Sequence, residues 1–293
     1  MEIHRLGHLK LALGECPVWH GQQLWLMDCR QGLIVALNPD TGEVRERHEV
    51  PPPLGSFAFN GDGGDTIVLS LKEEIAALNL RSGNLRSLAR IEASSPHLRL
   101  NDGTALADGS FVVGTMHGFR APDEPPLGGL YRLDTGLKLH KLDDGFGVTN
   151  GPCVNPLDGR LHVADSAARV IYSYVIGADG TLADKQVFVR TDTHDSGPDG
   201  CTFDSDGGLW TALVRIGALA RFDMQGRLTH KIDLPVVHPS ALCFGGPEMG
   251  DLFVTSISDS GRLSASGPMD GGVLKLTGLG FRGTARPVCR MPL

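Results

Sequence analysis

Six short apolar runs recur along the chain at nearly even intervals. Each run is rich in β-branched or aromatic residues and is too short for a helix, so each is predicted to be a strand. Successive runs start about 40 to 50 residues apart, which is the span of one four-stranded propeller blade. The runs are LWLMD at 24–28, TIVLS at 66–70, SFVVGT at 110–115, RLHVAD at 160–165, GLWTAL at 208–213 and DLFVTS at 251–256.

A series of glycine-containing turns recurs with the same spacing as these runs. In each turn, apolar residues flank a glycine that we expect to take positive φ in a hairpin. A strand precedes each turn and another follows it, so every unit is expected to contain at least two hairpins. The glycines are Gly42, Gly83, Gly136, Gly180, Gly226 and Gly278.

Only the segment LKEEIAALNL at 71–80 has a helix-like pattern, and its phase places it in a strand pair of the second unit. The whole pattern predicts an all-β fold, a six-bladed β-propeller with four-stranded blades around a central channel. Residues 1–293 would then form a single domain. A large barrel or a pair of sandwiches explains the period less well.

Composition narrows the class of protein. The 293 residues are 41% hydrophobic and 21% charged, which suits a soluble globular domain, and the net charge is -7. No basic cluster is present, so we expect no nucleic-acid partner. No apolar run is long enough to cross a bilayer and the N-terminus lacks the core of a signal peptide, so we expect no membrane partner and a cytoplasmic location. We also expect a monomer or weak dimer.

Several kinds of site have no support in the sequence. No G-x-S-x-G elbow, phosphate-binding loop, G-x-G-x-x-G fingerprint or H-E-x-x-H pair is present. The six cysteines are scattered without a C-x-x-C pair, so we interpret them as small buried hydrophobic residues. His194, in THDSGPDG, is interpreted as a loop residue, with a proton shuttle as the alternative.

Oxygen-bearing side chains stand about ten residues before four of the apolar runs. They are Glu15, Asn101, Asn150 and Asp199, and we expect them to meet at one end of the channel. Carboxylates brought together in a partly dehydrated channel repel each other, and a hard divalent cation would remove the conflict. Each Asp-Gly or Asn-Gly pair alone is only a turn signal, but four in matching phase favour a site. Gly200 is expected to turn the backbone tightly after Asp199. The second and sixth units offer only Ser56 and the HPSAL stretch with His238 and Ser240.

At these same residues the chain resembles the gluconolactonase family that includes regucalcin, also called senescence marker protein. The matching stretches are GECPVW, RLNDG, TNGP, PDG with GLWTAL, and CFGG with LFVTS, and they span nearly the whole chain. The resemblance implies a divalent metal held by Glu15, Asn150 and Asp199, with Asp199 also the general base. It places Asn101 near the metal and Arg99 on the substrate. The metal remains open among calcium, zinc, manganese, magnesium and ferrous iron.

One departure from the family lies in the third unit. Family members have an acidic residue three positions after the Met of GTM, whereas this chain has Phe119 there, preceded by His117. We count both among the candidate substrate-binding residues. The Pro-rich segment 118–128 is predicted to be a loop over the channel mouth, where Asp123 or Glu124 could replace the missing acid.

The resulting prediction is metal-dependent hydrolysis of a sugar lactone to its aldonic acid. Two alternatives stay open: a metal-dependent esterase on a non-sugar ester or aryl lactone, and a non-catalytic metal-binding propeller.

Overall fold

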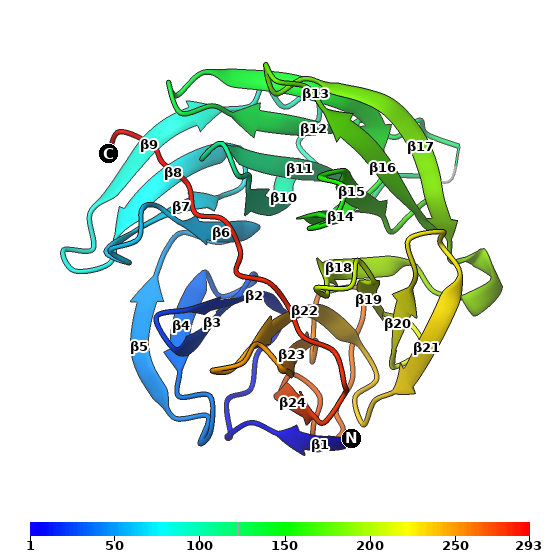
Figure 1. Cartoon of the computed structure of the whole chain (residues 1–293). Helices are drawn as coiled ribbons and strands as arrows, with labels where there is room; N and C mark the ends of the chain where they lie inside the picture. The colour runs from blue at the N-terminus through cyan, green and yellow to red at the C-terminus, as the bar shows by residue number, and fades with distance from the viewer. Residues whose placement is uncertain (122) are drawn as a thin grey trace.

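The computed structural model describes residues 1–121 and 123–293 and consists of six four-stranded antiparallel sheets arranged in a ring (Figure 1). The predicted fold is confirmed: the chain forms a six-bladed β-propeller. Along the described chain, the helical content is one 3-10 turn, η1 (Asp192–His194). No described helix is long and apolar enough to cross a membrane.

The blades follow one another along the chain. Blade 1 contains β2 (Gly14–His20), β3 (Gln23–Asp28), β4 (Leu33–Leu37) and β5 (Val44–Glu49). Blade 2 contains β6 (Ser56–Phe59), β7 (Thr66–Ser70), β8 (Glu74–Asn79) and β9 (Leu85–Arg90). Blade 3 contains β10 (Leu98–Ala105), β11 (Phe111–His117), β12 (Gly128–Leu133) and β13 (Leu139–Phe146).

The second half of the ring repeats the plan. Blade 4 contains β14 (Thr149–Val154), β15 (Leu161–Asp165), β16 (Val170–Ile176) and β17 (Leu182–Arg190). Blade 5 contains β18 (Pro198–Phe203), β19 (Leu209–Leu213), β20 (Ala218–Phe222) and β21 (Leu228–Asp233). Blade 6 contains β22 (Pro239–Gly245), β23 (Asp251–Ser256), β24 (Val273–Thr277) and β1 (Glu2–Arg5).

Burial along each blade explains the apolar runs of the sequence. A middle strand is covered by neighbouring blades on both faces and is mostly buried, as in β4, LIVAL, where all five residues are apolar and buried. An outer strand reaches solvent and becomes polar, as in β5, VRERHE. The helix-like segment 71–80 forms β8, as its phase predicted.

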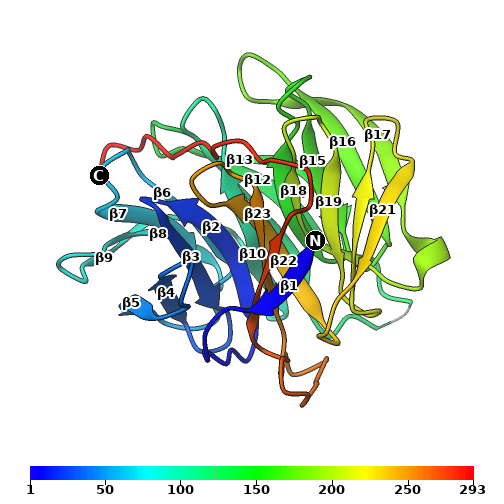
Figure 2. The same ribbon diagram turned by 60° about the horizontal axis from the view of Figure 1, so that its bottom comes forward.

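Blade 6 differs from the prediction. We expected a strand after Gly278, but the outer strand of this blade is β1, from the N-terminus, which pairs antiparallel with β24. Joining the first residues to the last blade closes the ring and removes the free edge of β24. The remaining residues form an irregular tail across one end of the channel, drawn in red in Figures 1 and 2.

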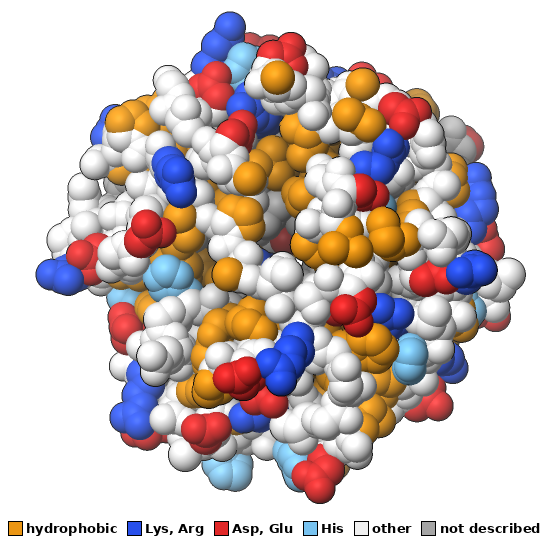
Figure 3. All heavy atoms as spheres, in the orientation of Figure 1, with side chains coloured by type: hydrophobic (Ala, Val, Ile, Leu, Met, Phe, Trp, Pro, Cys, Tyr) orange, Lys and Arg blue, Asp and Glu red, His pale blue; other side chains and the backbone are white. Residues whose placement is uncertain are grey.

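Backbone hydrogen bonds hold this tail to blades 5 and 6, through Arg282 and Gly283, and to blades 2 and 3. Cys289 N donates to Phe59 O at 2.7 Å in blade 2, and Arg290 N donates to Gly109 O at 2.8 Å in blade 3. Figure 3, which shows the face that carries the tail, has hydrophobic, acidic and basic side chains interspersed.

Five of the predicted turn glycines take positive φ, but Gly136 does not. In that hairpin the left-handed residue is Leu137, with φ 64°. The turn therefore places its left-handed position one residue later than we predicted.

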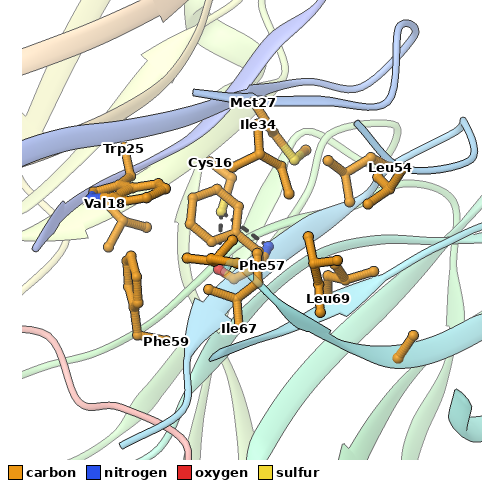
Figure 4. Packing of buried hydrophobic residues seen from close by; sticks show 14 of the residues in the cluster. Cys16, Val18, Trp25, Met27, Ile34, Leu54, Phe57, Phe59, Ile67 and Leu69 are labelled. Carbon is orange, nitrogen blue, oxygen red and sulfur yellow. Dashed lines mark hydrogen bonds between the residues drawn. The ribbon is translucent and has the colours of Figure 1, made fainter. Parts of the chain in front are cut away.

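The cysteines are free, and all but the partly buried Cys153 are buried, which confirms their interpretation as packing residues. Cys16 illustrates their place between blades. Its thiol donates to Phe57 O at 3.3 Å, among hydrophobic side chains of blades 1 and 2 (Figure 4).

Candidate active site and metal centre

Innermost strands carry a β-bulge near their start in five of the six blades. In each, the register against the second strand shifts by one residue: after Glu15, Leu100, Asn150, Pro198 and Pro239. A bulge re-aims the side chains beside it, and it recurs in barrels and near active sites. Only β6 pairs without a shift, and its inner residue is Ser56.

The bulges bring the predicted residues to one pocket. A cavity of about 300 Å³ is lined by Glu15, Arg99, Asn101, Asn150 and Asp199, which come from four blades. Asn150 and Asp199 are only 8% and 7% exposed. The structure therefore brings together the three predicted metal ligands and two of the predicted substrate contacts.

Gly200 does not act as we expected. It lacks positive φ, and a Cβ there would lie 2.5 Å from the Cβ of Ala241 in blade 6. The left-handed residues beside the bulges are Cys16, with φ 48°, and Gly151, with φ 53°. Gly200 is thus required for close packing between blades 5 and 6 and does not make a tight turn.

The two carboxylates of the pocket disfavour each other. Burial raises the pKa of Glu15 well above its usual range, and the charges of Asp199 and Asp102 raise it further. Burial, then the charge of Asp102, likewise raises the pKa of Asp199. A bound cation would relieve both the burial cost and the repulsion.

The oxygen atoms of the pocket fit a hard divalent cation only if the side-chain amide of Asn150 is counted with the two carboxylates. No three His, Cys, Asp or Glu side chains of the described residues gather closely enough to hold a metal ion. Glu15 and Asp199 supply two carboxylates, and the side-chain amide of Asn150 is the further oxygen donor that the predicted ligand set includes. Carboxylate and amide oxygens are the ligands that such cations accept.

A chain of hydrogen bonds orients the Asn150 amide. Asn101 Nδ2 donates to Asn150 Oδ1 at 2.7 Å, and Arg99 Nη1 donates to Asn101 Oδ1 at 2.8 Å. On the other side, Asn150 Nδ2 donates to Ser166 Oγ at 2.8 Å. Ser166 Oγ in turn donates to Pro198 O at 2.6 Å, next to Asp199. The network links blades 3, 4 and 5 around the pocket.

The sequence of the chain is similar to those of known proteins. The sequence matches the profile of the SMP-30/Gluconolactonase/LRE-like region over residues 13–258. The chain is a member of this family. It is 29% identical to pentonolactonase XacC of Haloferax volcanii, covering 90% of this chain and 88% of the relative. It is 30% identical to 6-deoxy-6-sulfogluconolactonase of Pseudomonas putida, covering 94% of both chains.

Solved structures share the fold of this SMP-30/gluconolactonase-like chain. The structure of regucalcin from Agrobacterium tumefaciens strain C58, described as a calcium-binding protein, superposes with a TM-score of 0.86. It covers 98% of this chain and 97% of that one at 23% sequence identity. The two sequence relatives, pentonolactonase XacC and 6-deoxy-6-sulfogluconolactonase, are sugar lactonases by name. Their names support lactone hydrolysis as the activity of this family member.

Phe119 and His117 lie in the third unit, where this chain differs from the other family members. Phe119 is 74% exposed, with φ 56°, and the Arg262 guanidinium lies 4.7 Å from its ring centre. His117 is buried, with Nε2 3.6 Å from Glu124 Oε1. Neither Phe119 nor His117 is among the residues that line the cavity. Their roles as substrate contacts stay predictions.

The other candidate residues lie elsewhere. His194 is in η1, with its ring 6.4 Å from that of Phe222, and does not line the cavity. Ser56 Oγ donates to Asn101 O at 3.0 Å, and Ser240 Oγ donates to Gly14 O. These hydroxyls stabilise neighbouring inner strands.

Sequence reasoning missed four polar residues of the pocket lining: Ser166, Arg215, Ser260 and Arg262. Each lies in the connection that follows the second strand of its blade, namely β15, β19 or β23. In an antiparallel blade this connection is at the same end as the start of the innermost strand. The polar residues just after each apolar run were therefore the available signal.

Proposed function

We propose that the protein is a metal-dependent sugar lactonase that hydrolyses an aldonolactone to its aldonic acid. One observation carries the proposal: Glu15, Asn150 and Asp199, from three blades, line a single cavity in which both carboxylates have raised pKa values. The names of the related lactonases support the reaction class. The volume of about 300 Å³ suits a small molecule of monosaccharide size.

Glu15, Asn150 and Asp199 would hold one divalent cation, for which calcium, zinc, manganese, magnesium and ferrous iron are all candidates. When bound, such a cation supplies Lewis-acid polarisation of the lactone carbonyl and stabilises developing negative charge. The description of the related Agrobacterium regucalcin as calcium-binding supports a divalent cation here.

Asp199 is the proposed general base. Its carboxylate would take the proton of the attacking water and return it to the ring oxygen that leaves. Arg99 and Asn101, which also line the cavity, would donate hydrogen bonds to the substrate and orient the ring. A cytoplasmic location and a monomeric or weakly dimeric state remain predictions.

The general base is tested by Asp199→Asn. We expect lactone hydrolysis to fall by about 10²- to 10⁴-fold, as for loss of general acid-base catalysis, while the circular dichroism spectrum stays that of the wild type. Glu248→Gln, at an exposed pair with Arg282, is the matched control and should hydrolyse at the wild-type rate. A variant at Asp199 with near-normal turnover would remove this residue from the chemistry.

Metal dependence has a separate test. Treatment with a chelator should abolish activity and lower the melting temperature, and adding back a divalent ion should restore both. The assay should use a panel of aldonolactones, aryl lactones and other esters. Cleavage of aryl esters alone would favour the metal-dependent esterase. If the protein binds metal but hydrolyses none of the substrates, the non-catalytic metal-binding propeller is favoured.

A further inference from the structure

Three arginines line the pocket without a carboxylate partner. They are Arg99, Arg215 and Arg262, and none forms an ion pair within 4.0 Å among the described residues. Two acidic residues close to them in the chain have other partners. Asp259, near Arg262, lies 2.7 Å from Arg30, and Asp102, near Arg99, accepts a hydrogen bond from Gly151 N at 2.8 Å.

The position of Arg262 depends on a contact across the channel mouth. Arg262 lies between β23 and β24 of blade 6, in a segment that projects beyond the ends of the blades (Figure 2, in orange). Its guanidinium stacks over the ring of Phe119, which follows β11 in blade 3. Blades 3 and 6 face each other across the ring (Figure 1), so this cation–π contact spans the mouth.

The hydrogen bonds of both arginine backbones support this arrangement. Ser260 Oγ accepts from Leu263 N at 2.9 Å and closes the turn that carries Arg262. Ser196 Oγ accepts from Arg215 N at 3.0 Å. Both arginine side chains are otherwise exposed at the rim, where they can bind a ligand.

Charge at the pocket differs from that of the whole molecule. The three arginines balance the two lining carboxylates, Glu15 and Asp199, and the neighbouring Asp102, on a chain of net charge -7. A divalent cation between the carboxylates would leave two positive charges in excess. Such a field attracts anions, and guanidinium groups match the geometry of carboxylate, phosphate and sulfonate oxygens.

We propose that the substrate lactone carries an anionic substituent, a phosphate, sulfonate or carboxylate, on the carbon farthest from the carbonyl. Arg215 and Arg262 bind this group at the rim, while the carbonyl faces Glu15 and Asp199. Phe119 acts as a positioning residue that holds Arg262 over the mouth. The inference rests on the proposed lactonase function.

The first experiment compares two lactones that differ only at C6, where one has a hydroxyl and the other a phosphate. For the wild type, kcat/KM should be at least about tenfold higher for the phosphorylated lactone, and sodium chloride should reduce the preference. Arg215→Gln and Arg262→Gln should each lower the ratio severalfold. Arg282→Gln, at an exposed pair, should leave the ratio unchanged. Equal kcat/KM for both lactones would overturn the inference while keeping the lactonase.

The second experiment measures binding without turnover, by calorimetry with the chelator-treated protein. The C6-phosphorylated aldonate should bind more tightly than the unsubstituted aldonate and more tightly than inorganic phosphate, and Arg262→Gln should weaken it. If no lactone is hydrolysed but this preference holds, the proposed reaction fails and the anion site stands. Binding of inorganic phosphate as tight as that of the sugar phosphate would overturn the substrate assignment.

The role of Phe119 has its own test. Phe119→Leu removes the cation–π contact, so KM for the phosphorylated lactone should rise severalfold with kcat nearly constant. Phe119→Tyr keeps an aromatic face and should restore KM. If Leu and Tyr behave alike, Phe119 does not position Arg262.

Discussion

A single hydroxyl group connects two of the proposed metal ligands. Ser166 accepts a hydrogen bond from the Asn150 amide nitrogen and donates one to the carbonyl of Pro198, directly before Asp199. Because the amide nitrogen is held by Ser166, the amide oxygen faces Asn101. Partners of this kind orient metal ligands without touching the metal.

Removing that hydroxyl should weaken metal binding. We expect Ser166→Ala to lower affinity for the divalent cation by about 10- to 100-fold, since outer partners of metal ligands have effects of this size. Titration calorimetry with chelator-treated protein measures the affinity. Ser82→Ala, in an exposed turn, is the control. Wild-type affinity in Ser166→Ala would show that Asn150 is oriented by its other contacts.

At the scale of elements, the bulged inner strand is the unit that builds the site. The bulge places a polar side chain in the channel, and the residues that follow it pack tightly against the next blade. In β18 the constraint falls on Gly200, where any side chain would meet Ala241 of β22. Side chain, bulge and interblade packing are therefore coupled within a few residues.

Gly200→Ala tests this coupling. The added methyl group meets Ala241, so we expect a loss of about 1–3 kcal/mol in the free energy of unfolding, as for overpacked cores. Gly63→Ala is the matched control, since nothing lies within 4 Å of the position that its methyl group would take. Denaturant unfolding measures both. Equal stability of the two variants would show that the blades separate without cost.

At the scale of the whole molecule, closure of the ring depends on a strand from the opposite end of the chain. Glu2 pairs with Thr277 and Arg5 with Leu274, so β1 completes blade 6. Without it, β24 would present unpaired backbone groups, which are templates for association.

Deleting residues 1–5 should therefore lower the melting temperature and cause concentration-dependent association. Thermal unfolding and light scattering measure the two effects. Deleting residues 292–293, which are exposed, is the control and should change neither. A monomer of wild-type stability after loss of β1 would show that interblade packing alone closes the ring.

The sequence by itself determined the six repeats and the phase of Glu15, Asn101, Asn150 and Asp199. Both are local properties: strand alternation, turn residues and a fixed offset from each apolar run repeat in every blade. Residues near the start of each innermost strand are expected to face the same channel, although Glu15 and Asn150 pair just before the register shift and Asn101 and Asp199 lie one residue further along. Their common location followed without knowledge of any long-range contact.

Tertiary structure alone decided how the ring closes, why Gly200 is a glycine and how Arg262 is held at the rim. The pairing of β1 with β24, the approach of Gly200 to Ala241 and the stacking of Arg262 on Phe119 all join different parts of the chain. Periodicity carries no information about such contacts, because each depends on where whole blades are placed in the ring.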